Sequence, residues 1–61
     1  MHQIRTRIIA RGIDMPQSTS WQFQHSLVLF RMYEQAPGHT PYMAIAEDEN
    51  GQVVGQLLAV T

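Results

Sequence analysis

The sequence has 61 residues, of which 44% are hydrophobic and 15% charged, and its formal net charge is −1. This composition is typical of a globular domain rather than a disordered chain. Its four basic residues, all arginine, are too few for nucleic-acid binding by phosphate neutralisation, and the absence of cysteine excludes disulfides and thiolate metal sites. We expect one small domain over residues 1–61, which needs additional protein for stability.

The longest apolar run, residues 27–30, is far too short to span a bilayer. Residues 2–10 lack the unbroken apolar stretch of a signal peptide. We therefore expect a cytoplasmic location and no membrane span. His2, His25 and His39 lie far apart in the sequence, and no closely spaced pair among them predicts a zinc site.

Residues 3–10 predict a half-exposed β-strand. A β-branched residue stands at every second position from Ile4 to Ile8, and arginines lie between them. This two-residue period is typical of a strand with one face on a core. Residues 13–19 follow as a loop, in which Pro16 restricts one backbone dihedral.

A helix is predicted from Ser20 or Ser26 to about residue 35. Its apolar stripe recurs at spacings of three and four residues through Phe23, Leu27, Phe30 and Tyr33, and Leu29 and Met32 widen it. Ser26, directly before the second of these, is one candidate for the N-cap, and Ser20 is the other. Pro37 ends the helix, because proline cannot continue it and disfavours helical geometry in the preceding residue.

Residues 41–48 and 52–60 predict two antiparallel strands on either side of the pair Asn50 and Gly51. This pair favours a two-residue type I′ turn, in which both central residues have positive φ. Such a turn places Met43 opposite Leu58, Ile45 opposite Gln56 and Ala46 opposite Gly55.

Both faces of this predicted hairpin are largely apolar. One face carries Met43, Ile45, Val54, Leu58 and Val60, and the other carries Tyr42, Ala44, Ala46, Val53, Leu57 and Ala59. We expect the helix to cover one face and another part of a protein to cover the second. The fold class is therefore α+β: a small β-α-β-β unit with one helix on a short, mostly antiparallel sheet and a C-terminal hairpin. The last strand reaches residue 61 without a stop signal, so we expect a truncated fragment of a longer chain.

Several short motifs follow one another in a recognisable order. Residues 23–26 (Phe-Gln-His-Ser) lead into the helix, residues 37–38 (Pro-Gly) follow it, residues 41–46 (Pro-Tyr-Met-Ala-Ile-Ala) form a strand, and residues 51–55 read Gly-Gln-Val-Val-Gly. This order resembles the opening of Fem-like acyltransferases, which belong to the GNAT superfamily of acetyltransferases and related enzymes. Members of this family resemble the peptidoglycan-bridge aminoacyltransferases, which are built from GNAT-like halves. The resemblance covers residues 23–60 and implies a GNAT-like N-terminal half.

The resemblance implies a scaffold without a catalytic centre. The superfamily holds the acyl-CoA pyrophosphate with a glycine-rich loop at a helix N-terminus, where free backbone N–H groups meet the phosphates. Here the four glycines are isolated from one another, and no helix follows the last strand. We therefore assign no catalytic, cofactor-binding or metal-binding residue. Acyl-CoA or an aminoacyl donor would bind only in the full-length parent.

A few single residues suggest chemistry, and each has a simpler structural interpretation. His25 and His39 are candidate general bases, but neither has a partner nearby in the sequence, and we expect them at the helix entrance and in a loop. The acidic residues 47–49 are expected at a solvated hairpin tip rather than around a cation. Trp21 and Phe23 are expected in a small core rather than in a ligand-stacking platform.

Two functional hypotheses follow. In the first, the chain is the non-catalytic N-terminal subdomain of a GNAT/Fem-like acyltransferase, and its partner is the remainder of the parent chain. In the second, it is a free-standing α+β interaction module that binds no cofactor and forms a homodimer. An uncharged, apolar last strand at a sheet edge predicts self-association of the isolated chain, unless the N-terminal strand pairs with that edge.

Overall fold

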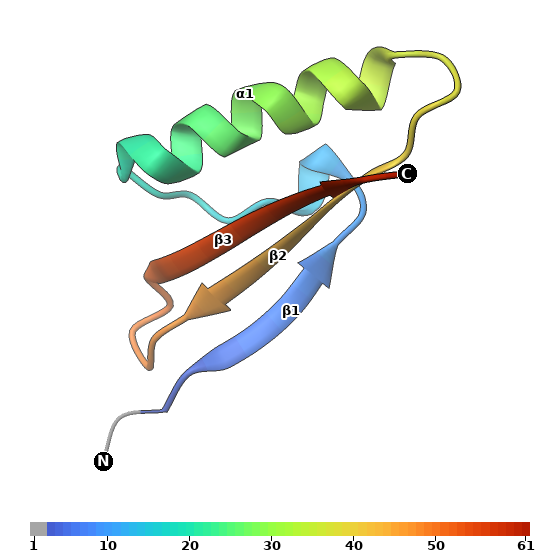
Figure 1. The fold of residues 1–61 in the computed structure, drawn as a ribbon. Helices are drawn as coiled ribbons and strands as arrows, with labels where there is room; N and C mark the ends of the chain where they lie inside the picture. Colours follow the sequence, from blue (N-terminus) through green and yellow to red (C-terminus); the bar gives the residue numbers. More distant parts are fainter. Residues whose placement is uncertain (1–2) are drawn as a thin grey trace.

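The computed structural model describes residues 3–61. Its elements are β1 (Arg5–Ile9), a 3-10 turn η1 (Gly12–Asp14), α1 (Trp21–Gln35), β2 (Pro41–Glu47) and β3 (Val53–Val60). The strands form one antiparallel sheet in the order β1-β2-β3, and α1 lies across one face of it (Figure 1). The predicted α+β fold, a β-α-β-β unit with a C-terminal hairpin, is confirmed.

Helix α1 begins at Trp21, so Ser20 rather than Ser26 is its N-cap. The Ser20 Oγ accepts a hydrogen bond from the Phe23 N–H at 3.5 Å. At the other end, the helix stops at Gln35, as the proline predicts. Ala36 has the extended geometry (φ −81°, ψ 128°) that a following proline favours.

The N-cap gives a first testable prediction. Ser20→Ala should lower the free energy of unfolding by about 1 kcal/mol, because the Phe23 N–H loses its acceptor. Ser26→Ala, inside the helix, should be neutral or slightly stabilising, because alanine has the higher helix propensity. Urea denaturation of both variants at one protein concentration is the measurement, and a larger loss for Ser26→Ala would contradict the assignment.

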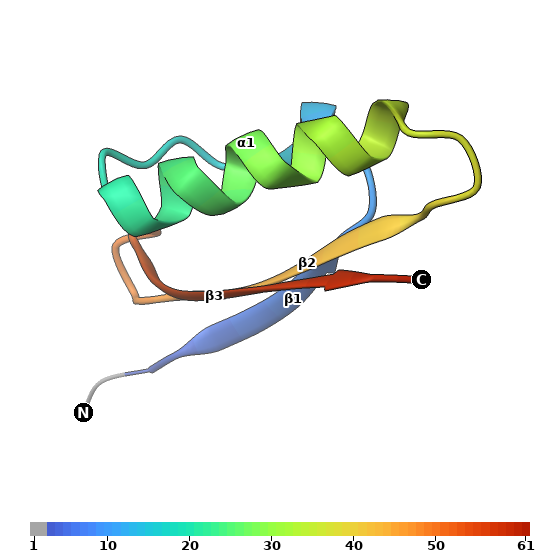
Figure 2. The same ribbon diagram turned by 45° about the horizontal axis from the view of Figure 1, so that its top comes forward.

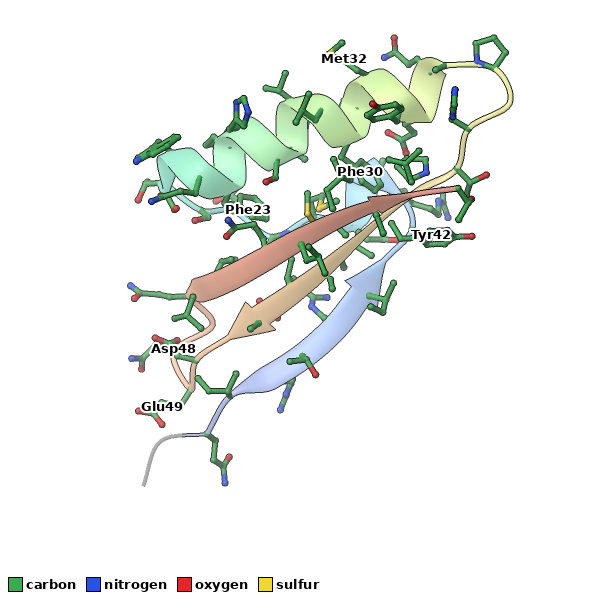
Figure 3. All side chains as sticks on the ribbon, in the orientation of Figure 1. Phe23, Phe30, Met32, Tyr42, Asp48 and Glu49 are labelled. Atoms are coloured by element: carbon green, nitrogen blue, oxygen red, sulfur yellow. The ribbon has the colours of Figure 1, made fainter. Side chains whose placement is uncertain are left out.

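The core lies between α1 and the sheet. Its buried members come from β1, α1 and β2, and they are Ile9, Phe23, Leu27, Phe30, Met43 and Ile45. Met15, Val53 and Leu58 pack against this group. Figure 3 shows Phe23 and Phe30 pointing from α1 toward the sheet and Met32 pointing away from it. The predicted apolar stripe of the helix is therefore confirmed at Phe23, Leu27 and Phe30, but it is wrong at Met32, whose side chain is 62% exposed.

Trp21 does not join this core, and its predicted place beside Phe23 is wrong. Its side chain is 72% exposed, whereas that of Phe23 is fully buried. Two positions along a helix with 3.6 residues per turn differ by about 200° around the axis. When Phe23 faces the sheet, Trp21 therefore faces solvent.

The register of the hairpin agrees with the prediction along most of its length. Met43 pairs with Leu58, Ile45 with Gln56 and Ala46 with Gly55. On its other side β2 pairs with β1 and not with a later segment, since the partner of Ile9 is Met43. The central strand β2 is thus the only one of the three with neighbours on both sides among residues 3–61.

The hairpin turn is not the predicted type I′ turn. Gly51 has φ +79°, but none of residues 3–61 other than glycine has positive φ, so Asn50 lies outside the left-handed region. The Gly51 N–H donates to the Asp48 carbonyl at 3.0 Å, and the Asp48 N–H donates to the Gln52 carbonyl at 2.9 Å. The loop therefore has three residues, a common hairpin length that needs one left-handed glycine.

The side chain of Asp48 supports this alternative turn. Its Oδ1 accepts the N–H groups of Asn50 and Gln52, each at 2.9 Å. An aspartate that bonds the backbone two residues later is a common way to stabilise a turn. The predicted turn was wrong because the Asn-Gly preference does not take this carboxylate into account.

A β-bulge next to the turn restores the register. Glu47 pairs with Val53, but Ala46 pairs with Gly55, so that Val54 is an extra residue on β3. The three-residue loop is one residue longer than the predicted turn, and the bulge compensates for the difference. The predicted faces of the two valines are therefore wrong: Val53 packs against the core, and Val54 is 56% exposed.

Candidate functional site

The two outer strands of the sheet have open edges that differ in charge. Arg5 and Arg7 lie on β1, and the Arg7 Nε donates to Glu47 Oε1 at 2.9 Å. In contrast, residues 53–61 contain no charged side chain and no proline. The N-terminal strand pairs with β2, so the outer edge of β3 has no strand neighbour in the described part of the chain.

The backbone groups that β3 presents outward follow from its pairing with β2. Thr61 and Thr40 exchange both backbone hydrogen bonds, at 3.0 and 3.1 Å. Successive residues of a strand direct their N–H and C=O groups to opposite sides. The groups of Val60, Leu58 and Gln56 therefore point away from β2, toward the open edge.

The sheet face opposite α1 carries no charged side chain. Met43 and Ile45 are buried beneath the helix, so their sequence neighbours and the residues paired with those neighbours face the other way. This open face consists of Thr6, Ile8, Tyr42, Ala44, Ala46, Gly55, Leu57 and Ala59. Figure 2 shows α1 on one side of the sheet and no described segment on the other.

The open face has one large exposed residue on each outer strand and a group of small residues near its centre. Ile8 on β1 is 66% exposed and Leu57 on β3 is 69% exposed. Between them, Ala44, Ala46 and Gly55 border a shallow hollow of about 370 Å³. The sequence predicts that both faces become covered; α1 covers one, and nothing among residues 3–61 covers the other.

The histidines do not converge on a site. His25 lies exposed near the N-terminal end of α1. His39 lies in the loop after α1, where its ring meets that of Tyr33 edge-on with a centroid separation of 5.7 Å. His2 lies outside the described residues. These positions match the predicted helix entrance and loop.

The acidic run is at the hairpin tip, as predicted, and its carboxylates have local partners (Figure 3). Glu47 bonds Arg7, and Asp48 bonds the turn backbone. Glu49 Oε2 accepts the Gln3 N–H at 3.3 Å. Within residues 3–61, no three His, Asp or Glu side chains come together in a way that would hold a metal ion.

One polar contact was not predicted from the sequence. Glu34 Oε2, near the end of α1, accepts the Gly12 N–H at 2.9 Å and so joins the helix to the 3-10 turn. A Cβ at position 12 would lie 2.8 Å from Glu34 Oε1. The two residues are 22 positions apart in the chain, and no local pattern indicates such a pair. Glu34 therefore has a structural partner.

No helix in the described part of the chain has the length and apolar character needed to cross a membrane.

No protein-family model matches the sequence, and no curated protein or solved structure shows significant similarity to it.

Proposed function

We propose that this chain is a non-catalytic β-α-β-β subdomain of a cytoplasmic GNAT/Fem-like acyltransferase. Acyl or aminoacyl transfer takes place elsewhere in the full-length protein, where the acyl-CoA or aminoacyl donor binds. The subdomain contributes early strands and the first helix, and its partner is the remainder of that protein. The proposal draws on the order of the sequence motifs and on the sheet order β1-β2-β3 with α1 on one face.

The observation that carries the proposal is the pair of unoccupied surfaces on the sheet. The outer edge of β3 has three residues with outward backbone groups, and the open face has no charged side chain. A sheet edge and a sheet face of this kind are normally covered by further strands and helices. A structural role within a larger protein therefore explains the open edge of β3 and the open face of the sheet, which a catalytic role does not explain.

The test is whether binding of the acyl donor requires a protein longer than the 61-residue chain. Titration of the 61-residue chain with acetyl-CoA, followed by calorimetry and amide chemical shifts, should show no specific binding. The reading frame should continue past Thr61 into a glycine-rich phosphate loop, and the longer protein should bind acetyl-CoA. Low-micromolar binding by the 61-residue chain would overturn the proposal.

The second candidate function is a free-standing interaction module that forms a homodimer and binds no cofactor. The uncharged edge of β3 favours it, because that edge is equally suited to a strand from another molecule. A native stop codon after Thr61 would support this candidate against the first.

A further inference from the structure

We propose that a second copy of the 61-residue chain docks on the outer edge of β3. The two β3 strands run antiparallel, and the two sheets become one continuous six-stranded sheet. The inference depends on the edge and not on the acyltransferase proposal. In a longer acyltransferase, a following strand would compete for the same edge.

The hydrogen-bonding groups of this edge are suited to another strand. Gln56, Leu58 and Val60 direct their backbone N–H and C=O groups outward, as the Thr61–Thr40 bonds imply. Strand edges are commonly protected by lysine, proline, inward-pointing charge or a β-bulge. The bulge of β3 lies at its first residues, Val53 and Val54, and residues 55–61 contain none of these features.

The distribution of charge selects β3 over β1 as the self-pairing edge. An antiparallel pair of β1 strands would bring Arg5 and Arg7 of one copy close to those of the other, and like charges on opposed strands are destabilising. A β3 pair brings no charges together. Pairing of β1 with β3 would leave one edge open on each copy and would continue into a filament rather than close as a dimer.

The side-chain alternation also determines which registers are possible. Two residues directly opposite each other in an antiparallel pair have their side chains on the same face of the sheet. In two identical strands the numbers of such residues must therefore differ by an even number, which places the twofold axis at a residue and not between two residues. With the axis at Leu57, residues 54–60 all find partners: Val54 lies opposite Val60 of the second copy, and Gln56 lies opposite Leu58. An axis at Gln56 would pair an equal number of β3 residues, 53–59, but would place the β-bulge at Val53 and Val54 inside the paired segment; any other position of the axis shortens the segment.

This register brings the two copies of Leu57 together on the open face. The backbone groups of Leu57 point toward β2 by the same alternation, so the two leucines form a non-hydrogen-bonded pair, with Cα atoms about 4.5 Å apart. Leu57 is 69% exposed in the single chain. Pairing buries part of this apolar surface against an identical side chain.

Sedimentation equilibrium over a hundredfold range of concentration should show the 61-residue chain in a monomer–dimer equilibrium. Leu57→Lys should raise the dimer dissociation constant by about tenfold or more, because two ammonium groups then meet at the axis. Ile8→Lys is the matched control: Ile8 is on the same face and nearly as exposed as Leu57, but β2 separates its strand from β3, so the substitution should leave the dimer intact.

A cysteine placed on the axis gives a second, independent measurement. The chain has no native cysteine, and the expected Cα separation is within the range that a disulfide requires. Under mild oxidation Leu57→Cys should form a covalent dimer, whereas Ile8→Cys should stay largely monomeric. A clean monomer at all concentrations, or equal effects at positions 8 and 57, would overturn the proposed edge pairing. Neither result would affect the acetyl-CoA test.

Discussion

Phe30→Ala should leave the chain without a cooperative folding transition at room temperature. Phe30 has no exposed surface and belongs to the core between α1 and the sheet. Removal of a buried phenylalanine side chain typically costs about 3–5 kcal/mol, because the site loses its transfer free energy and a cavity remains. A core in a domain of this size rarely supplies more than about 3–5 kcal/mol in total.

Circular dichroism during heating is the measurement, and Trp21→Ala is the matched control. Both residues are aromatic and belong to α1, but the Trp21 side chain is 72% exposed. Its truncation should change the free energy of unfolding by no more than about 0.5 kcal/mol. Equal losses for the two variants would mean that Trp21 is part of the core and that α1 is rotated about its axis.

Gly51→Ala should destabilise the hairpin by about 1–2 kcal/mol. Gly51 has φ +79°, and a Cβ there meets nothing within 4 Å, so the cost comes from the left-handed backbone and not from a clash. Asn50→Ala should be nearly neutral, since Asn50 does not have positive φ. Guanidinium denaturation of both variants gives the two changes in the free energy of unfolding.

The comparison of these two variants distinguishes the observed turn from a type I′ turn. In a type I′ turn both central residues have positive φ, and alanine would be costly at either position. In the three-residue loop only position 51 requires a left-handed residue. Comparable losses for Asn50→Ala and Gly51→Ala would therefore contradict the loop held by Asp48.

The candidate site could be anticipated only in part. The alternation of apolar residues in 41–48 and 52–60 indicates two apolar faces, and the absence of charge in the last strand indicates an edge prone to pairing. The sequence does not indicate which strand becomes the free edge. That depends on β1 pairing with β2 across Ile9 and Met43, a contact between residues far apart in the chain.

The local signals determined the elements of this fold. Each depends on a short stretch of chain: the β-branched alternation for β1, the apolar stripe for α1, Pro37 for the helix end, and the apolar strands flanking a Gly-containing turn for the hairpin. Such signals act over a few residues, because backbone geometry and side-chain direction repeat with the period of the element.

Only the tertiary structure decided the choices that local signals left balanced. Ser20 rather than Ser26 begins α1, because Phe23, Leu27 and Phe30 must all reach the sheet from one continuous helix. The same need to bury one face determines that Val53 and not Val54 points inward, after the Asp48 loop has shifted the strand by one residue. Helix starts and strand registers that differ little in local energy are decided by the apolar area that each one buries.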